Sequence, residues 1–279
     1  MTNQKQSYAG AGIELVRMLA ARGERIFTSK RARELAPDIG LSESYIRQSL
    51  HHLTRADWLV RLRKGLYAIS STVPGVTPAH EFEIAMHLVD PAAISHWSAM
   101  QYHGLTDQLP ARVFVLTTKD CSVPRIRGKK ASRDIEGYPV GDTTYRFVQL
   151  KPERFFGTEK VWVSDARIEI TDPERTLIDG LTMPWLCGDF AEVLQAFQRR
   201  LANLDLERIT SYALRLDDAT AKRLGWVLKH LDVESPEVET LQNLPIKGYR
   251  TLDPSGPARG PFNAEWHIRE NLPGKVARF

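Results

Sequence analysis

The stretch at residues 41–69 constrains the fold more than any other part of the 279-residue chain. It reads LSESYIRQSLHHLTRADWLVRLRKGLYAI. At about 100° per residue, Ile46, Leu50 and Leu53 fall on one side of a helix that has Ser42 as its N-cap. The opposite side carries polar residues, namely Ser44, Arg47, Gln48, His51 and Arg55. The pattern predicts a helix that packs with one face and exposes a row of hydrogen-bond donors with the other.

Two further helices are predicted before this one. The segment IELVRMLAARG at 13–23 has a helical apolar period and a natural stop at Gly23. The segment FTSKRARELA begins with Thr28 and Ser29 as candidate N-caps and ends before Pro37. Their predicted buried residues are Ile13, Val16, Leu19 and Ala20 in the first, and Ala32 and Leu35 in the second. Together with the third helix they form a helix–turn–helix plan.

A short basic hairpin is predicted directly after the third helix. Trp58–Leu62 and Leu66–Ile69 are strand-like, and Gly65 between them permits the positive φ of a tight turn. The hairpin carries three cations, Arg61, Arg63 and Lys64. Cations at such a position suit phosphate or minor-groove contact and supply salt-dependent affinity rather than base discrimination.

The net charge supports a nucleic-acid-binding role for this part of the chain. The whole chain carries +4. Residues 1–70 contain twelve Lys or Arg and six Asp or Glu, which gives +6 and leaves −2 for the remainder. A polar helix face or a basic turn alone usually means only a solvated surface, but here the helices, the hairpin and the charge agree. The residues predicted to contact double-stranded DNA are Ser44, Tyr45, Arg47, Gln48, His51, Arg55, Arg61, Arg63 and Lys64.

The Ser-, Pro- and Gly-rich stretch SSTVPGVTP at 70–78 is interpreted as a linker. It divides the chain into a winged helix–turn–helix domain at 1–72 and a larger domain at 73–279. The second domain is predicted to be mixed α/β, with strands in ARVFVLTT, TTYRFVQL and VWVSDARIEI and a helical half from residue 188 onward. The predicted fold class is therefore α+β.

Two helix starts in the second domain are predicted from their capping residues. Thr77 with Pro78 is expected to begin a helix over TPAHEFEIAMHL. Thr171 and Glu174 form a capping box in TDPERTLIDGL, whose buried stripe is expected at Leu177, Ile178 and Leu181. The basic run RIRGKKASR at 125–133 is either a second polyanion or partner contact or, preferably, a solvated hairpin.

The sequence offers no constellation for catalysis. Phosphate-binding glycine loops, HExxH and GxSxG are absent from it. The pairs His80/His87 and His96/His103 are seven residues apart, which favours packing or surface roles over metal ligation. Three acids could suggest a nuclease but are better explained as turn, strand-face and cap residues, namely Asp165, Glu169 and Asp172. We therefore expect no enzyme activity, no metal site and no cofactor.

The composition also suggests a cellular setting. The N-terminus lacks the apolar core of a secretion signal, and the chain has no apolar run of 18 residues, so no membrane is expected. Its two cysteines, Cys121 and Cys187, lie 66 positions apart and do not form a disulfide framework. A reducing cytoplasm fits best.

Four phrases resemble the AbiEi family of antitoxins from bacterial abortive-infection toxin–antitoxin systems. They are LVRLRKGLYAI, ISHWSAMQYHGL, ITDPERTLIDGL and FNAEWHIREN. The resemblance implies a winged helix that binds inverted repeats in its own promoter and represses its operon. It also implies a second domain that counters a nucleotidyltransferase-like toxin in phage defence, with or without a stable complex. No toxin-neutralising residue can be assigned from it.

Two alternatives remain open at the level of the sequence. The chain could be a winged-helix transcription factor whose second domain senses a small ligand and has no antitoxin role. It could also be a DNA-targeted nuclease that uses Asp165 or Glu169. Genomic neighbourhood and metal-dependent cleavage assays would distinguish these alternatives from an autorepressing antitoxin.

Overall fold

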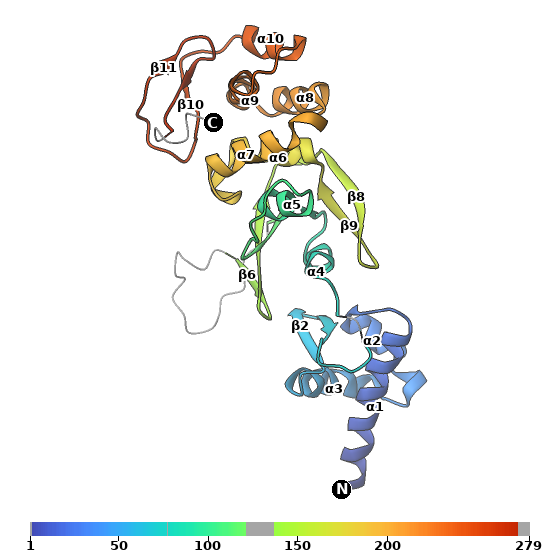
Figure 1. Ribbon diagram of the computed structural model, residues 1–279. Coiled ribbons are helices and arrows are strands. Elements are labelled where there is room, and N and C mark those ends of the chain that lie inside the picture. Colours follow the sequence, from blue (N-terminus) through green and yellow to red (C-terminus); the bar gives the residue numbers. More distant parts are fainter. Residues whose placement is uncertain (1, 77, 121–136, 273–279) are drawn as a thin grey trace. The chain divides into compact units, whose positions relative to one another are not determined.

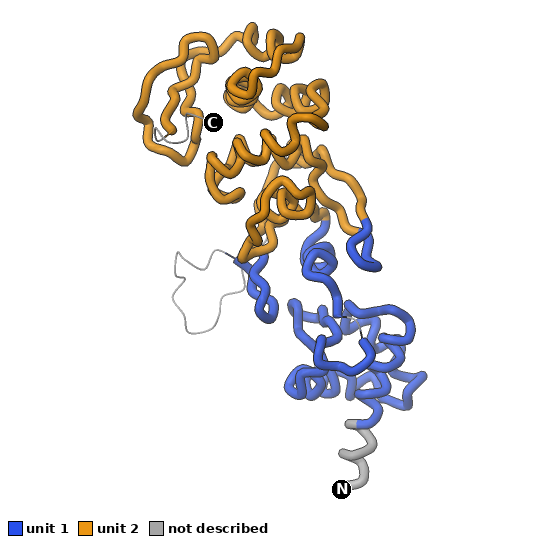
Figure 2. Tube along the Cα trace, in the orientation of Figure 1, with its two compact units in different colours: residues 1–90, 123–145, 162–167 blue, residues 91–122, 146–161, 168–279 orange. Residues whose placement is uncertain are grey.

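A computed structural model describes residues 2–76, 78–120 and 137–272 (Figure 1). Its chain clusters into two compact units (Figure 2). Unit 1 comprises residues 1–90, 123–145 and 162–167, and unit 2 comprises residues 91–122, 146–161 and 168–279. The two units are therefore not contiguous in the sequence.

The first seventy residues of unit 1 fold as a winged helix. The helices are α1 (Thr2–Ala21), α2 (Ser29–Leu35) and α3 (Glu43–Arg55), with a short 3-10 turn at Pro37–Ile39 between the last two. The strands are β1 (Ile26–Thr28), β2 (Leu59–Arg63) and β3 (Leu66–Ile69), in the antiparallel order β1-β3-β2. The predicted helix–turn–helix with a basic hairpin is confirmed.

Local chemistry explains the ends of these elements. The Thr28 hydroxyl accepts a hydrogen bond from the Arg31 backbone N–H at 3.1 Å, which caps α2. Gly23 and Gly65 have φ values of +71° and +77°, as the predicted turns require. The predicted apolar faces of α2 and α3 are buried, whereas on α1 Val16 and Leu19 are buried together with Leu15. Ile13 and Ala20 are only partly buried.

The helix predicted to begin at Thr77 and Pro78 begins later in the structure. The helix α4 (Glu81–Leu88) begins at Glu81, and its N-cap is His80, whose Nδ1 accepts from the Phe82 N–H at 3.1 Å. Pro78 lies outside the helix, and Thr77 lies outside the described residues. An imidazole nitrogen has here taken the capping role that the sequence pattern gave to a hydroxyl.

A six-stranded mixed sheet has the order β6-β7-β5-β4-β9-β8. The strands are β4 (Ala93–Ile94), β5 (Val113–Thr117), β6 (Tyr138–Val140), β7 (Thr143–Gln149), β8 (Thr158–Val163) and β9 (Ala166–Thr171). Adjacent strands pair antiparallel in β4–β5 and parallel in β4–β9. All three predicted strand segments are confirmed, and Asp165 lies in the turn between β8 and β9, as expected from the sequence.

The helices of unit 2 pack around one large core. Its helices are α5 (His96–Tyr102), α6 (Pro173–Thr182), α7 (Phe190–Arg200), α8 (Leu206–Leu216), α9 (Asp218–His230) and α10 (Pro236–Asn243). A small sheet of β10 (Arg250–Thr251), β11 (Phe262–Asn263) and β12 (Ile268–Arg269) follows them (Figure 1). The predicted α+β class, with a helical second half of the larger domain, is confirmed.

Helix α9 packs closely against the turn between β11 and β12. Trp266 is 1% exposed and lies against Gly225 of α9. A methyl group at residue 225 would come within 2.0 Å of the Trp266 ring, so only glycine fits there.

The predicted capping box at α6 is wrong by one residue. The N-cap is Asp172, whose Oδ1 accepts from the Arg175 N–H at 2.7 Å, whereas the Thr171 hydroxyl bonds to that of Thr176. Glu174 is buried and bonds to Arg200 rather than reaching back to the cap. The buried stripe of Leu177, Ile178 and Leu181 is confirmed.

The same helix holds a buried ion pair that the sequence analysis did not anticipate. Arg175 Nε donates to Asp179 Oδ1 at 2.9 Å, and both side chains are at most 3% exposed. The guanidinium also donates to the carbonyl oxygens of Arg154 and Phe156 and lies 4.3 Å from the centre of the Phe156 ring. These contacts compensate the desolvation of the buried charges.

Candidate nucleic-acid interface

The polar face of α3 is exposed to solvent. Ser44, Arg47, Gln48, His51 and Arg55 are all exposed, while Ile46, Leu50 and Leu53 on the other side are at most 6% exposed. The predicted division of this helix into a packed and a free face is therefore present. Tyr45 differs from the other predicted contact residues because it is half-buried and packs against the winged-helix core.

The wing places its cations beside that face. Arg61 and Arg63 lie on β2 and Lys64 occupies the turn, and all three are exposed. The pairing of β2 with β3 has an irregularity between Arg61 and Arg63. The buried side chain of Leu62 anchors this part of the strand between the two arginines.

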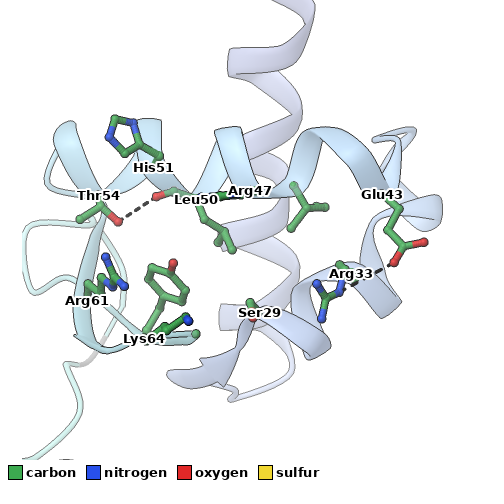
Figure 3. A pocket seen from close by; sticks show the side chains of 12 residues that line it. Ser29, Arg33, Glu43, Arg47, Leu50, His51, Thr54, Arg61 and Lys64 are labelled. Atoms are coloured by element: carbon green, nitrogen blue, oxygen red, sulfur yellow. Dashed lines mark hydrogen bonds and ion pairs between the residues drawn. The ribbon is translucent and has the colours of Figure 1, made fainter.

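A groove of about 740 Å³ separates the wing from α2 and α3. Figure 3 shows Arg61 and Lys64 on its wing side, His51 and Arg47 on α3, and Ser29 with Arg33 on α2. Apolar residues, Ile46, Leu50 and Tyr67, are also among the lining. Ser29 and Arg33 were not predicted as groove residues, although the basic run SKRAR at the start of α2 is a signal from which they could have been found.

Ion pairing separates the cations of the winged helix into two groups. Away from the groove, Arg17, Arg22 and Arg25 each have a carboxylate partner, and Arg31 is held by Glu24 at 2.6 Å. The Arg31 guanidinium lowers the pKa of Glu24, as expected for such a pair. Arg33, at the rim of the groove, pairs loosely with Glu43 at 3.8 Å.

The cations of α3 and the wing belong to the other group. Within the described part of the chain, no carboxylate lies within ion-pair distance of the following five side chains: Arg47, Arg55, Arg61, Arg63 and Lys64. These five uncompensated cations are thus concentrated on the surface of α3 and the wing, while Lys30 of α2 also has no carboxylate within ion-pair distance among the described residues. Such a surface attracts polyanions and suits phosphate contact.

Three interactions hold the winged helix against the rest of unit 1. Arg25, itself 9% exposed, pairs with Glu83 of α4 at 2.9 Å and with Asp165 of the β8–β9 turn at 2.7 Å. Tyr138 donates its hydroxyl proton to the Leu62 carbonyl at 2.7 Å. Burial raises the pKa of Tyr138, which keeps this donor protonated. The Leu62 bond fixes the wing strand directly.

The acids that could have suggested a nuclease have structural partners. Asp165 pairs with Arg25, which lowers the pKa of its carboxyl group. The Glu169 carboxylate accepts from Thr158 at 2.5 Å, and Asp172 caps α6. They therefore occupy the turn, strand-face and cap positions expected from the sequence.

The paired histidines also have separate environments. His80 caps α4, and His103 Nε2 lies 2.7 Å from the Thr171 carbonyl oxygen. His96 is fully buried with its Nδ1 2.9 Å from Ser95 Oγ, and burial lowers its pKa to about 4. Across the residues that the structure describes, no group of three or more His, Cys, Asp or Glu side chains could hold a metal ion.

Some predicted features fall outside what can be described. The basic run at 125–133 and Cys121 lie outside the described residues, while Cys187 is a buried free thiol. Of the helices that are described, none has the length and apolar character needed to cross a membrane.

Residues 14–70 match the model of a family described as transcriptional regulators, AbiEi antitoxin. The resemblance is thus confirmed for the winged helix, which includes the phrase LVRLRKGLYAI; the other three phrases lie outside the match. The crystal structure of the RV2827C protein from Mycobacterium tuberculosis is similar over 96% of this chain and 94% of that one, with a TM-score of 0.69 and 14% sequence identity. At that identity the likeness concerns the fold alone. No curated protein sequence matches this chain.

Proposed function

We propose that this protein is a DNA-binding autorepressor that also acts as the antitoxin of an AbiE-type system. The single observation that carries the DNA-binding half is the surface of α3 and the wing, where five exposed cations have no carboxylate partner among the described residues. The family match of residues 14–70 supports both halves in general terms. Residues 1–72 would bind DNA, and residues 73–279 would oppose a toxin.

In this proposal α3 enters the major groove of duplex DNA. Arg47 can donate two hydrogen bonds to a guanine edge, and Gln48 can pair with adenine. Ser44, on the same exposed face, contacts either a base edge or a phosphate. The buried face of α3 fixes the angle at which these side chains reach the bases.

The wing acts as a positioning element rather than a reader. Arg61, Arg63 and Lys64 contact phosphates beside the recognised bases. His51 and Arg55 lie on the C-terminal half of the exposed α3 face, where His51 lines the groove together with Arg61 and Lys64, so they connect the two sets of contacts. Tyr45, because it is half-buried, supports α3 and contributes at most a phosphate contact through its hydroxyl group.

Protection of the region upstream of the gene itself tests autorepression. Footprinting with the full chain should protect an inverted repeat in a salt-sensitive manner, and a charge-reversed wing carrying Lys64→Glu should lose protection. Arg17→Ala is a matched control because Arg17 is exposed but paired with Glu14. Equal protection of unrelated DNA would contradict autorepression.

Coexpression with the neighbouring gene tests the antitoxin half. If that gene encodes a nucleotidyltransferase-like toxin, growth arrest should be relieved by the full chain, and affinity capture should show whether relief requires a stable complex. Relief should persist in the Lys64→Glu variant when both genes are driven from foreign promoters. Unrelieved arrest would leave a regulator without antitoxin activity.

A further inference from the structure

The small sheet near the end of unit 2 has two chemically different faces. Its strand order is β10-β12-β11, with Thr251 opposite Arg269 and Phe262 also opposite Arg269. The side chains of Leu252, Trp266 and Ile268 are at most 1% exposed and join the core of unit 2. Because side chains alternate along a strand, the residues between these positions face away from the core.

The outward face carries a group that we call the aromatic platform, consisting of Tyr249, Phe262, His267 and Arg269. Tyr249 is 41% exposed and Phe262 is 54% exposed, and their ring centres are 4.7 Å apart. The Arg269 guanidinium lies 4.4 Å from the centre of the Phe262 ring, and the His267 ring lies 5.5 Å from that of Tyr249. Each residue therefore supports the position of another, so the platform is ordered although it is exposed.

Cations outnumber acids on the segments around the platform, by four to three over residues 247–270. Four cations, Lys247, Arg250, Arg259 and Arg269, have no carboxylate within ion-pair distance among the residues that the structure describes. Hydrogen bonds from neutral groups hold the acids of these segments: Glu270 Oε1 accepts from Trp226 Nε1 at 2.8 Å and from Asn263 at 2.9 Å, and Glu265 accepts from Gln242 at 3.1 Å. Asp253 is likewise used within its own turn by Ser255.

We propose that the aromatic platform binds single-stranded RNA. Exposed rings beside unpaired cations suit unpaired bases on a phosphate backbone, because bases stack on aromatic side chains while cations contact the phosphates. A duplex would hide the faces of its bases from Tyr249 and Phe262. The Thr251 hydroxyl lies on the face that carries Arg269 and can bond a ribose 2′-hydroxyl, which favours RNA over single-stranded DNA.

The platform is separate in sequence from the winged helix, so the experiment must distinguish RNA binding at the platform from nucleic-acid binding at the winged helix. The full chain is titrated into a fluorescein-labelled, unstructured 20-nucleotide RNA in the presence of excess unlabelled duplex DNA, which saturates the winged helix. A single-stranded DNA of the same base sequence is the parallel probe. Fluorescence anisotropy then reports binding to the platform.

The variant Tyr249→Ala with Phe262→Ala should bind this RNA at least about ten-fold more weakly, because two stacking faces are lost. Phe262→Tyr should bind as the wild type does, since it retains a stacking ring. Trp162→Ala is the matched control, because Trp162 is 68% exposed but lies on β8. If the double variant does not fold, Arg269→Gln, which removes the cation opposite Phe262, should still lower the salt slope by about 0.7 for one lost phosphate contact.

Three results would overturn the proposal. If the double variant bound the RNA as tightly as the wild type, the platform would be excluded as the RNA-binding site. If duplex DNA displaced the RNA, the RNA would be bound by the winged helix. Equal affinity for the two single strands would exclude the preference for RNA. None of these results bears on promoter binding, which depends on Lys64 and its neighbours rather than on the platform.

Discussion

Removing one wing cation should change the salt dependence of operator binding by a calculable amount. Arg61, Arg63 and Lys64 are exposed and lack a carboxylate partner among the described residues, so each is counted as one phosphate contact. At about −0.9 per contact, two copies on an inverted repeat give a slope of about −5.4 for log affinity against log salt. Affinity should then fall about 2,000-fold between 50 and 200 mM salt. With Lys64→Ala in both copies the slope becomes about −3.6, and the fall about 150-fold.

Fluorescence anisotropy of an operator fragment at several salt concentrations measures both slopes. The Arg17→Ala control removes an exposed cation that pairs with Glu14 at 3.7 Å, and it should leave the slope unchanged. Lys64→Ala should also weaken binding to unrelated DNA by the same factor, since phosphates carry no base identity. A wild-type slope in the Lys64 variant would refute the assignment of the wing to the backbone.

Three other perturbations follow from the structure. Arg47→Ala should cost about 1–3 kcal/mol of operator binding and relax base preference at one position, as binding to a panel of single-base operator variants will show; uniform weakening across the panel would contradict a reading role. Gly225→Ala should lower the free energy of unfolding by about 3 kcal/mol in urea titrations, since its methyl group overlaps Trp266. Gly10→Ala is the control, because a methyl group there meets no atom within 4 Å and should not destabilise the protein. Equal stabilities of the two variants would refute the packing argument. Because the buried His96 has its pKa lowered to about 4, the folded state binds fewer protons than the unfolded state, so stability should fall by about 2 kcal/mol from pH 7.5 to 5. His96→Asn should lack this part of the pH dependence.

Features set by short-range pattern were predictable from the sequence. The period of α3 separates Ile46 and Leu50 from Arg47 over a single helical turn, and the structure has the same division. The wing turn was equally predictable from the sequence, because Gly65 between two strand-like segments indicates a positive φ. These features depend on residues close in the chain, so a window of a dozen residues contains the needed information.

Features set by distant partners were not predictable. Strand β1 is only three residues long and is defined by its pairing with β3, more than thirty residues later. The acceptor that caps α6 is Asp172 rather than Thr171, because the Thr171 hydroxyl bonds to Thr176. Two or more neighbouring residues could serve as the cap, and only the packed structure selects one of them.

The groove shows the same limit at the candidate site. Its α3 and wing cations were identified from their own segments, but Ser29 and Arg33 reach it from α2. Their role becomes visible only when three elements are brought together. The burial of the Arg175–Asp179 pair was not predictable from the sequence either, since two opposite charges four residues apart on a helix usually indicate a solvated pair.

The ion pairs of Arg25 have a consequence for how this chain can be divided. A fragment that ends at residue 72 retains Arg25 but lacks both Glu83 and Asp165, and it also lacks the Tyr138 hydroxyl that bonds to Leu62. In that fragment the Arg25 guanidinium would be exposed to solvent, whereas it is buried in the intact protein. Truncation at the linker therefore does not yield the winged helix as it exists in the intact protein, and a chimera that carries this domain must also retain or replace these carboxylates.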